Sequence, residues 1–470
     1  MEKAILTRIT VIMITLLGLT NCASHSASFT SPTARQPATS GINMSLWQGN
    51  PADVWDKLQH TPPSKLAAMQ SETQDPVQKA WVQLALISKR NSVNTPQLAQ
   101  ELITWRSQNP SHPANQLLPD NAALTQLQSL TPPQKIAVLL PQSGTYESSG
   151  QTVREGFLNS YYANLPKTGK QSIKFYDTSA TQNMTTLYQQ AVADGADFII
   201  GPLVKEHVQQ LSREGAFNSP TLALNYTEAG WRSLPTNFYE FGLLPEDEVS
   251  QIADQAHAAG SSRAIIIAPQ TTWGNRLVSS FSTRWKANGG NVQETWYYPA
   301  NADFNKEIAR LLAVNLKVDK QLMKEGSDKE TLEKQRRHDF DVIFLFAQPE
   351  QARVIVPLLR YYYAADVPVY ASSSVFSGKP NPAKDVDLNG VIVCDIPWTK
   401  KIVRSTSPDD IQTGRLYAVG QDAYLLSQTL QRLERLPNFP IYGTTGALTL
   451  SSSQQIHRRL PCNVLNNGHI

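Results

Sequence analysis

The sequence predicts an α/β protein in which two lobes of doubly wound parallel sheet follow a short all-α region. From about residue 133 onward, short apolar runs typical of buried strands alternate with amphipathic stretches of helical spacing. This alternation is typical of βαβ units, whose crossover helices cover both faces of a parallel sheet. Nine such strands over about 340 residues fit two lobes better than one sheet. The expected strands span residues 136–140, 173–176, 198–200, 221–224, 264–268, 292–298, 342–346, 367–370 and 391–394.

The N-terminal residues have the pattern of an export signal followed by a tether. Lys3 and Arg8 precede an apolar run of about twelve residues, which is too short to span a bilayer. The tetrapeptide LTNC then places Cys22 where a lipobox has the cysteine that becomes acylated. We therefore expect residues 1–21 to be a lipoprotein signal peptide and Cys22 to be the lipid attachment site. Cleavage to an unlipidated secreted protein is the alternative.

The segment after the signal is expected to hold the folded part away from its membrane. Residues 22–43 are small, polar and proline-containing, so they have almost nothing to bury. Fully extended, this tether reaches at most about 70 Å. The residues that follow Cys22 include no adjacent Asp, which resembles lipoproteins sorted to the outer membrane. We expect a protein anchored there by lipid and facing the periplasm.

Residues 44–130 are expected to form a short helical region. Their tryptophans and leucines follow helical spacing, and Asp75-Pro76 and Asn94-Thr95 each predict a helix start. Helix pairs of this kind resemble one or two degenerate tetratricopeptide units. A free solenoid needs three or more repeats, so we expect this region to pack on the two-lobed domain at residues 134–470.

Composition and motifs argue against several classes of function. The formal net charge is only +3, and no Lys/Arg-rich block with interleaved aromatics indicates a nucleic-acid binder. The sequence contains no nucleophile elbow, dinucleotide fingerprint, P-loop or Ser-x-x-Lys motif. The eight histidines show no metal-ligand spacing. Glu246-Asp247-Glu248 fits the first turn of a helix beginning at Pro245 better than an acid/base pair. We therefore expect no catalytic residue, metal or cofactor.

Two cysteines other than Cys22 leave two alternatives open. An oxidising compartment permits a disulfide between Cys394 and Cys462. Cys394 also closes the apolar run of an expected strand, where a buried free thiol would act as a small hydrophobic side chain. The sequence does not choose between the two.

Nine blocks of sequence carry a resemblance to known proteins. The first, IAVLLPQSG at residues 136–144, resembles the first βα unit of type I periplasmic binding proteins. The others follow in order and are similar to the LpoA/LppC family: FIIGPLVKE at 198–206, YEFGLLPEDE at 239–248, RRHDFDVIF at 336–344, PEQAR at 349–353, YYYAADVPVY at 361–370, CDIPW at 394–398, YAVGQDAY at 417–424 and YGTTG at 442–446. The resemblance implies a two-lobed, type I periplasmic-binding-protein-like domain.

The resemblance also implies a function. Members of this family are outer-membrane lipoproteins that stimulate a class A penicillin-binding protein, the enzyme that polymerises and cross-links peptidoglycan. It therefore implies an enzyme regulator and not an enzyme. The implied partners are the synthase and, through the lipid anchor, the outer membrane, with peptidoglycan as a further candidate.

A receptor for a small amino-acid-like ligand is the main alternative, and a purely structural scaffold is a third. In amino-acid-binding relatives of the fold, small hydroxyl residues after the strands hold the ligand's carboxylate. Here bulky and charged residues follow two of the expected strands, which favours a filled cleft that binds no free amino acid. The candidate cleft residues are Ser143, Gly144, Thr145, Lys205, Asn225 and Tyr226.

Aromatic residues are the candidates for an interface with a protein partner, because such residues are enriched at interface hot spots. The candidates are Tyr361, Tyr363 and Trp398. The competing interpretation is that these neighbourhoods supply core contacts, because Tyr362 falls on the buried face of a helix and Trp398 follows a strand end.

Overall fold

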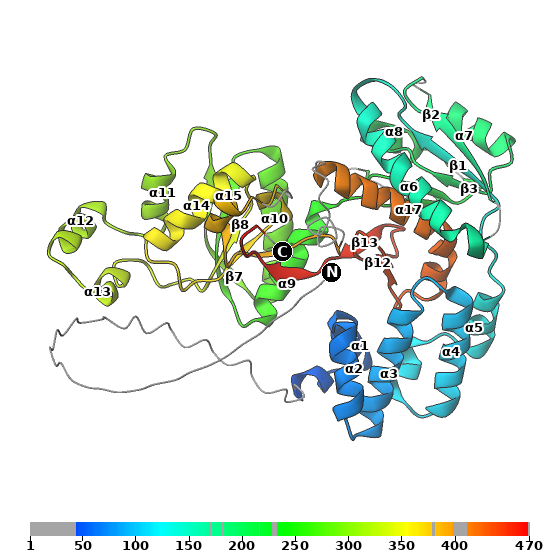
Figure 1. Ribbon diagram of the computed structural model, residues 1–470, viewed down its shortest axis with the longest axis horizontal. Helices are drawn as coiled ribbons and strands as arrows, with labels where there is room; N and C mark the ends of the chain where they lie inside the picture. Colours follow the sequence, from blue (N-terminus) through cyan, green and yellow to red (C-terminus); the bar gives the residue numbers. More distant parts are fainter. Residues whose placement is uncertain are drawn as a thin grey trace, which may run out of the picture. The chain divides into compact units, whose positions relative to one another are not determined.

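Two mainly parallel sheets organise the α/β part of the chain in the computed structural model (Figure 1). The structure describes residues 44–168, 171–180, 183–215, 217–227, 233–377, 381–397 and 411–468. The expected signal peptide and tether, with Cys22, lie outside these residues, as does Trp398.

The first sheet has five parallel strands in the order β2-β1-β3-β4-β5. Its central strand β1 is buried from Ile136 to Leu140, which explains why this run is continuously apolar. Its strands are β1 (Lys135–Leu140), β2 (Ser172–Asp177), β3 (Phe198–Ile200), β4 (Thr221–Ala223) and β5 (Phe238–Glu240). The connecting helices are η3 (Gly144–Tyr146), α6 (Glu147–Thr168), α7 (Met184–Ala193) and α8 (Lys205–Leu211). We call this sheet and its helices the first lobe.

The second sheet has six strands in the order β14-β10-β9-β8-β6-β7, and only β14 is antiparallel to its neighbour. Its strands are β6 (Arg263–Pro269), β7 (Asn291–Tyr298), β8 (Val342–Leu345), β9 (Val369–Ala371), β10 (Ile392–Cys394) and β14 (Cys462–Val464). The associated helices are α9 (Pro245–Ala258), α10 (Thr272–Ala287), α11 (Phe304–Leu311), α14 (Pro349–Tyr361), η4 (Ser373–Val375), α15 (Pro382–Asp385) and η5 (Val386–Leu388). We call this sheet and its helices the second lobe. All nine expected strands are present, and the predicted fold class is confirmed.

A small antiparallel sheet near the C-terminus was missed by the sequence prediction. It consists of β11 (Ile441–Tyr442), β12 (Ala447–Leu450) and β13 (Ile456–Arg459). These strands are two to four residues long, and β13 carries His457, Arg458 and Arg459. They therefore lack the continuous apolar run that marked the parallel strands. One apolar residue of each strand is nevertheless buried in the core of the first lobe.

The long helix α17 (Ile411–Arg435) follows β10 of the second sheet in sequence but packs against α6 of the first lobe. Two glycines allow this close approach. A Cβ on Gly420 would lie 2.0 Å from the carbonyl oxygen of Val153, and a Cβ on Gly156 would lie 2.0 Å from that of Tyr417. The two helix backbones therefore touch, and any side chain at either position would force them apart.

Residues 44–130 are helical, as predicted. Asp75 and Asn94 accept hydrogen bonds from the first turns of α3 and α4, so the two predicted helix starts are confirmed. The elements are η1 (Met44–Trp47), α1 (Pro51–His60), α2 (Pro63–Glu72), α3 (Pro76–Arg90), α4 (Thr95–Gln108), η2 (Pro113–Leu117) and α5 (Asn121–Gln128). Leu436 and Phe439, which follow α17, are buried in the same hydrophobic cluster as these helices. The helical region therefore packs on the α/β part of the chain, as its small size led us to expect.

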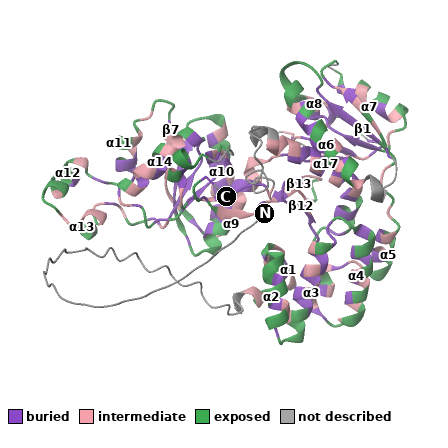
Figure 2. Cartoon of the chain, viewed as in Figure 1, coloured by how far each residue is buried: buried purple, intermediate pink, exposed green. Residues whose placement is uncertain are grey.

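The charged stretch at residues 317–339 contains α12 (Leu316–Lys324) and α13 (Lys329–Glu333). Most of its side chains are exposed or only partly buried (Figure 2). The stretch is therefore a largely solvated insertion between β7 and β8 of the second lobe. Among the described residues, no helix has the length and apolar character needed to cross a membrane.

Candidate functional site

A cavity of about 330 Å³ lies at the carboxyl end of the second sheet. Residues that follow four of its parallel strands line the cavity: Trp273 after β6, Gln348 after β8, Ser372 to Ser374 after β9, and Asp395 after β10. In open α/β sheets, ligands bind in the crevice outside the carboxyl ends of the strands. The topology therefore gives this cavity the position of a binding site.

A buried ion pair at the cavity joins the two lobes. Arg415 lies on α17, which packs on the first lobe, and its guanidinium donates to the Asp395 carboxylate at 2.7 Å. The side chains are 16% and 2% exposed. Arg415 also donates to the carbonyl of Ser373 at 3.3 Å. The pair fixes α17 against the second sheet at the point where the chain leaves β10.

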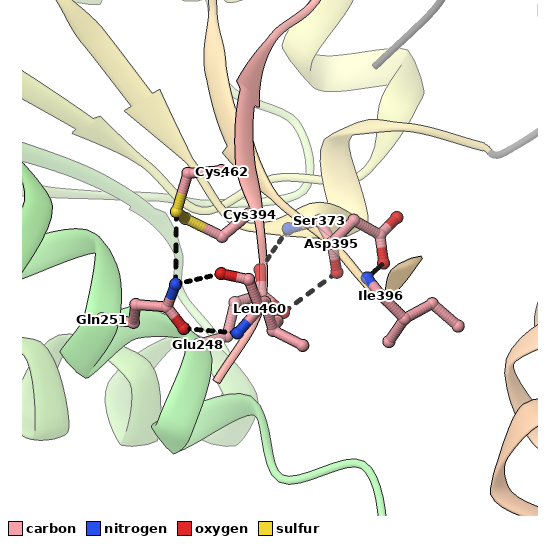
Figure 3. Close-up of a disulfide and its surroundings, with 8 residues drawn as sticks. All are labelled: Glu248, Gln251, Ser373, Cys394, Asp395, Ile396, Leu460 and Cys462. Atoms are coloured by element: carbon pink, nitrogen blue, oxygen red, sulfur yellow. Dashed lines mark hydrogen bonds between the residues drawn. A yellow bond between two sulfur atoms is a disulfide. The ribbon is translucent and has the colours of Figure 1, made fainter. Parts of the chain in front are cut away.

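Glu248 forms a second polar contact in the cavity. Its carboxylate accepts from the backbone N–H of Ser373 and, at 3.0 Å, from the hydroxyl of the same residue (Figure 3). Burial raises the pKa of Glu248 to about 7, against the opposing effect of the Ser373 hydrogen bond. Glu248 lies in the first turn of α9, as its neighbours Glu246 and Asp247 do, so the predicted placement of this acidic run is confirmed.

A disulfide joins Cys394 of β10 to Cys462 of β14 beside this cavity (Figure 3). Gln251 of α9 holds the chain next to it: its amide oxygen accepts from the N–H of Leu460 at 2.8 Å, and its nitrogen lies 3.3 Å from the Cys462 sulfur. The disulfide therefore links the end of β10, where the chain leaves the second sheet, to the start of β14, where the chain returns to it.

We expect loss of this disulfide to destabilise the protein strongly. The cysteines are 68 residues apart, and closing a loop of that length stabilises a fold by about 4 kcal/mol in the chain-entropy model. Urea unfolding of the oxidised protein, the reduced protein and the Cys394→Ala/Cys462→Ala variant measures the effect. The reduced protein keeps both sulfur atoms, so it separates the effect of losing the bond from the effect of losing the sulfur atoms in the double variant. Equal midpoints for oxidised and reduced protein would contradict the prediction.

The candidate cleft residues lie away from this cavity. Ser143, Gly144 and Thr145 are exposed after β1, and Lys205 begins α8. Asn225 accepts from the backbone N–H of Tyr226 at 2.9 Å. The buried Tyr226 hydroxyl donates to the carbonyl of Ile456 at 2.6 Å, so this residue joins the first lobe to the small antiparallel sheet. None of the six residues lines the cavity of the second sheet.

The sequence analysis missed the run Ser372-Ser373-Ser374, although a signal was present. The run begins two residues after the end of the expected strand at residues 367–370, and it has the small hydroxyl side chains that were considered only after strands of the first lobe. Applying the same criterion to every expected strand would have identified it.

The two candidate interface tyrosines differ in their surroundings. Tyr361, the last residue of α14, is 54% exposed. Tyr363 is half-buried, and its hydroxyl donates to Asp319 of α12. Tyr362 between them is buried, as the sequence indicated. Tyr363 thus attaches the charged insertion to the second lobe, whereas Tyr361 is available at the surface.

In the part of the chain that the structure describes, no group of three or more His, Cys, Asp or Glu side chains could hold a metal ion. Near the cavity, the ring of His457 lies 2.7 Å from the carboxylate of Asp247, and this hydrogen bond raises the pKa of His457. This contact anchors β13 to the first turn of α9.

Comparison with known proteins agrees with the architecture. The family model described as "LppC putative lipoprotein" matches residues 29–468. A relative from Photobacterium profundum, named "Penicillin-binding protein activator LpoA", is 27% identical over 439 residues, which cover 90% of this chain and 70% of the relative.

Two solved structures share the two-lobed fold. The LpoA (YraM) C-domain from Haemophilus influenzae, described as "a regulator of PBP1A", is 23% identical with a TM-score of 0.57, over 71% of this chain and 98% of that one. A "putative branched-chain amino acid ABC transporter" from Chromobacterium violaceum is 26% identical with a TM-score of 0.55, over 70% and 99% of the two chains. Because the family model matches nearly the whole sequence, the chain belongs to the LppC family of lipoproteins.

Proposed function

We propose that this protein is a lipoprotein of the outer membrane that binds a class A penicillin-binding protein and activates it. The observation that carries the proposal is the family match over residues 29–468, together with a relative that covers 90% of the chain and is named a penicillin-binding protein activator. The protein acts as a regulator and leaves the chemistry of peptidoglycan synthesis to its partner. Peptidoglycan itself is a further proposed contact.

An activator of this kind works by differential affinity. It must bind the active conformation of the synthase more tightly than the inactive one, because a ligand with equal affinity for both shifts no population. The synthase is bound to the inner membrane, so an activator on the outer membrane must reach across the periplasm. The expected tether at residues 22–43 supports the proposal, since a chain of that length would reach at most about 70 Å if fully extended.

The proposed lipid anchor is tested by Cys22→Ala. We expect the wild-type protein to begin at an acylated Cys22 and to fractionate with the outer membrane. The variant should appear in the soluble periplasm, because each buried CH₂ of an acyl chain contributes about 0.8 kcal/mol to membrane binding. Mass spectrometry of the N-terminal peptide measures this directly. An unlipidated N-terminus at another residue would rule out the anchor.

Activation is tested by reconstitution with the full chain. The purified lipoprotein in detergent is mixed with each class A synthase of the organism and lipid II, and cross-linked muropeptides are quantified. The full chain is needed because the helical region shares its core with Leu436 and Phe439. We expect binding to one synthase and a higher cross-linking rate. A folded lipoprotein that binds none of the synthases and leaves cross-linking unchanged would refute the proposal.

The exposed end of α14 is the surface that we propose for this contact. Tyr361→Ala should weaken synthase binding, because Tyr361 offers a large, rigid aromatic surface without a role in the core. Tyr162→Ala is the matched control, since Tyr162 is a 62% exposed tyrosine on α6 of the first lobe. Equal affinities for the Tyr361 variant and the control would place the contact elsewhere.

A further inference from the structure

The carboxylates around the cavity of the second sheet are already occupied by donors. Both oxygens of Glu248 accept hydrogen bonds from Ser373. Asp395 accepts from the N–H of Ile396 at 2.7 Å with one oxygen and from Arg415 at 2.7 Å with the other. Figure 3 shows the Glu248–Ser373 and Asp395–Ile396 contacts side by side at the end of the sheet. An ammonium group entering the cavity would therefore find its acidic side chains engaged.

The hydroxyls of the serine run are also engaged with protein groups. Ser373 donates to Glu248, and Ser374 donates to the carbonyl of Ala347 at 2.9 Å. The hydroxyls of Ser372 and Ser374 lie 2.6 Å apart and share a hydrogen bond. These hydroxyls hold the loop after β9 in place and shape the wall of the cavity.

Among the described residues that line the cavity, the charged donors that remain belong to two arginines, and Trp273 and Gln348 add neutral N–H donors. Arg458 lines the cavity and is only 6% exposed, yet its side chain makes a single hydrogen bond, to the carbonyl of Leu244 at 3.5 Å. Its Nε is buried and has no hydrogen-bond partner among the described residues, and the same holds for the Nε of Arg415. The neighbouring Asp247 is engaged by His457 and by the backbone N–H of Arg458.

A buried guanidinium without an ion-pair partner is costly, because charge is removed from water without compensation. Among the described residues, Arg458 forms no salt bridge, whereas Arg415 is paired with Asp395. A carboxylate in the cavity would supply the missing acceptor through charge-assisted hydrogen bonds.

The helix N-termini around the cavity contribute less than Arg458. Helices α9, α10 and α14 all begin beside the cavity, since Pro245, Trp273 and Gln348 line it. The N-terminal residues of α9 and α14 have no side-chain cap. N-terminal N–H groups and helix dipoles favour a bound anion, but the first turns of α9 and α14 already carry acidic residues, Glu246 to Glu248 and Glu350. The guanidinium of Arg458 is therefore the main feature of the cavity that favours an anion.

Apart from Gln348, the rest of the lining is apolar or aromatic. Leu277, Ile396 and Leu460 are buried, and Leu243 and Trp273 are partly buried. A volume of about 330 Å³ is at the small end of ligand pockets, which range from about 300 to 1,000 Å³. The cavity therefore suits a compact ligand with one anionic group and an apolar body.

We propose that this cavity binds a small organic carboxylate, with Arg458 as the principal partner of the carboxylate and Trp273 and Leu277 against the apolar body of the ligand. The site adds a small-molecule ligand to a protein whose proposed role is to bind a synthase, and it does not depend on that role.

The test uses the full chain in detergent, with thermal shift and isothermal calorimetry as the readouts. The probes are 4-methylpentanoate and leucine, which differ only in the α-ammonium group, together with benzoate, benzamide and inorganic phosphate. We expect saturable binding of 4-methylpentanoate or benzoate. Leucine should bind more weakly than 4-methylpentanoate, because its ammonium group finds no unoccupied carboxylate. Benzamide should bind more weakly than benzoate, because it lacks the negative charge. Phosphate should bind weakly because it lacks an apolar body.

Two variants identify the site. Arg458→Met should weaken carboxylate binding by about tenfold or more, the size expected for loss of a charge-assisted hydrogen bond. Arg459→Met is the matched control, because it makes the same change at the next residue of β13 and Arg459 does not line the cavity. Trp273→Ala is the second variant, should Arg458→Met not fold, and it should weaken benzoate binding because Trp273 is a partly exposed wall of the cavity.

Four results would overturn the proposal. They are the absence of a saturable response to either carboxylate, equal binding of benzoate and benzamide, tighter binding of leucine than of 4-methylpentanoate, and equal losses in the Arg458 and Arg459 variants. All these measurements are made on the lipoprotein alone. Failure of the carboxylate site is therefore distinguishable from failure to activate a synthase.

Discussion

Replacing Asp422 by alanine should lower the free energy of unfolding by about 3–5 kcal/mol. Asp422 is a 1% exposed residue of α17. Its carboxylate accepts four hydrogen bonds: from the N–H groups of Thr444 and Thr445, both at 2.7 Å, and from their hydroxyls at 2.8 and 2.6 Å. Alanine would leave both N–H groups and the hydroxyl of the buried Thr445 without an acceptor, whereas the Thr444 hydroxyl keeps the carbonyl of Ala418 at 3.1 Å. Each buried unsatisfied group costs about 1–3 kcal/mol.

Urea unfolding of Asp422→Ala and Asp422→Asn measures the effect. The asparagine variant should lose less, because it keeps one acceptor oxygen. Asp341→Ala is the matched control, since Asp341 also accepts two backbone N–H bonds, from Ser262 at 3.0 Å and Arg263 at 2.9 Å, but its side chain is 31% exposed. The prediction fails if Asp422→Ala is no more destabilising than Asp341→Ala.

The Asp422 contact also shows what the sequence could and could not reveal. The blocks YAVGQDAY and YGTTG were recognisable as family features. The structure explains them as one unit, in which Asp422 of the first block binds the threonines of the second. Gly443 belongs to the same unit, because a Cβ there would lie 2.4 Å from an oxygen of Asp422. A contact across some twenty residues leaves no local periodicity, so the sequence alone did not pair the two blocks.

The fold was predictable because parallel strands buried on both faces are continuous apolar runs separated by helical stretches. Strand β5 was not predicted, because it lacks a continuous apolar run. It is three residues long and ends at the fully buried Glu240, whose carboxylate accepts from the N–H of Thr227 and from the side chain of Gln455. A charged residue in the core is stable there only because of partners distant in sequence.

The cavity of the second sheet was less predictable than the strands. We sought ligand-binding residues after the strands of the first lobe, where the related fold suggested them, and the structure forms its cavity in the second lobe. Arg458 comes from β13, which was not an expected strand, and Arg415 comes from α17, which crosses from the other lobe. Residues that come from elements distant in the sequence cannot be assigned to one site from their spacing alone.

Replacing Phe439 by alanine should destabilise the protein by about 3–5 kcal/mol and loosen the helical region most. Phe439 is fully buried, and its ring centroid lies 4.9 Å from that of Trp55 in α1. The contact is extended by the indole N–H of Trp55, which donates to the carbonyl of Asn438 at 2.6 Å. The buried Arg432 of α17 also donates to the carbonyl of Ser92, between α3 and α4.

Hydrogen exchange measured peptide by peptide separates this effect from a global loss of stability. Phe376→Ala is the matched control, because Phe376 is 2% exposed in the core of the second lobe and loses the same atoms. Both variants should unfold at lower urea, but only Phe439→Ala should increase exchange in α1 and α3 more than in β6 and β8. The reason is that a cavity at Phe439 removes the apolar surface on which a helical region too small for a free solenoid depends. Equal exchange profiles for the two variants would mean that the helical region is held mainly by its own packing and by the Arg432 contact.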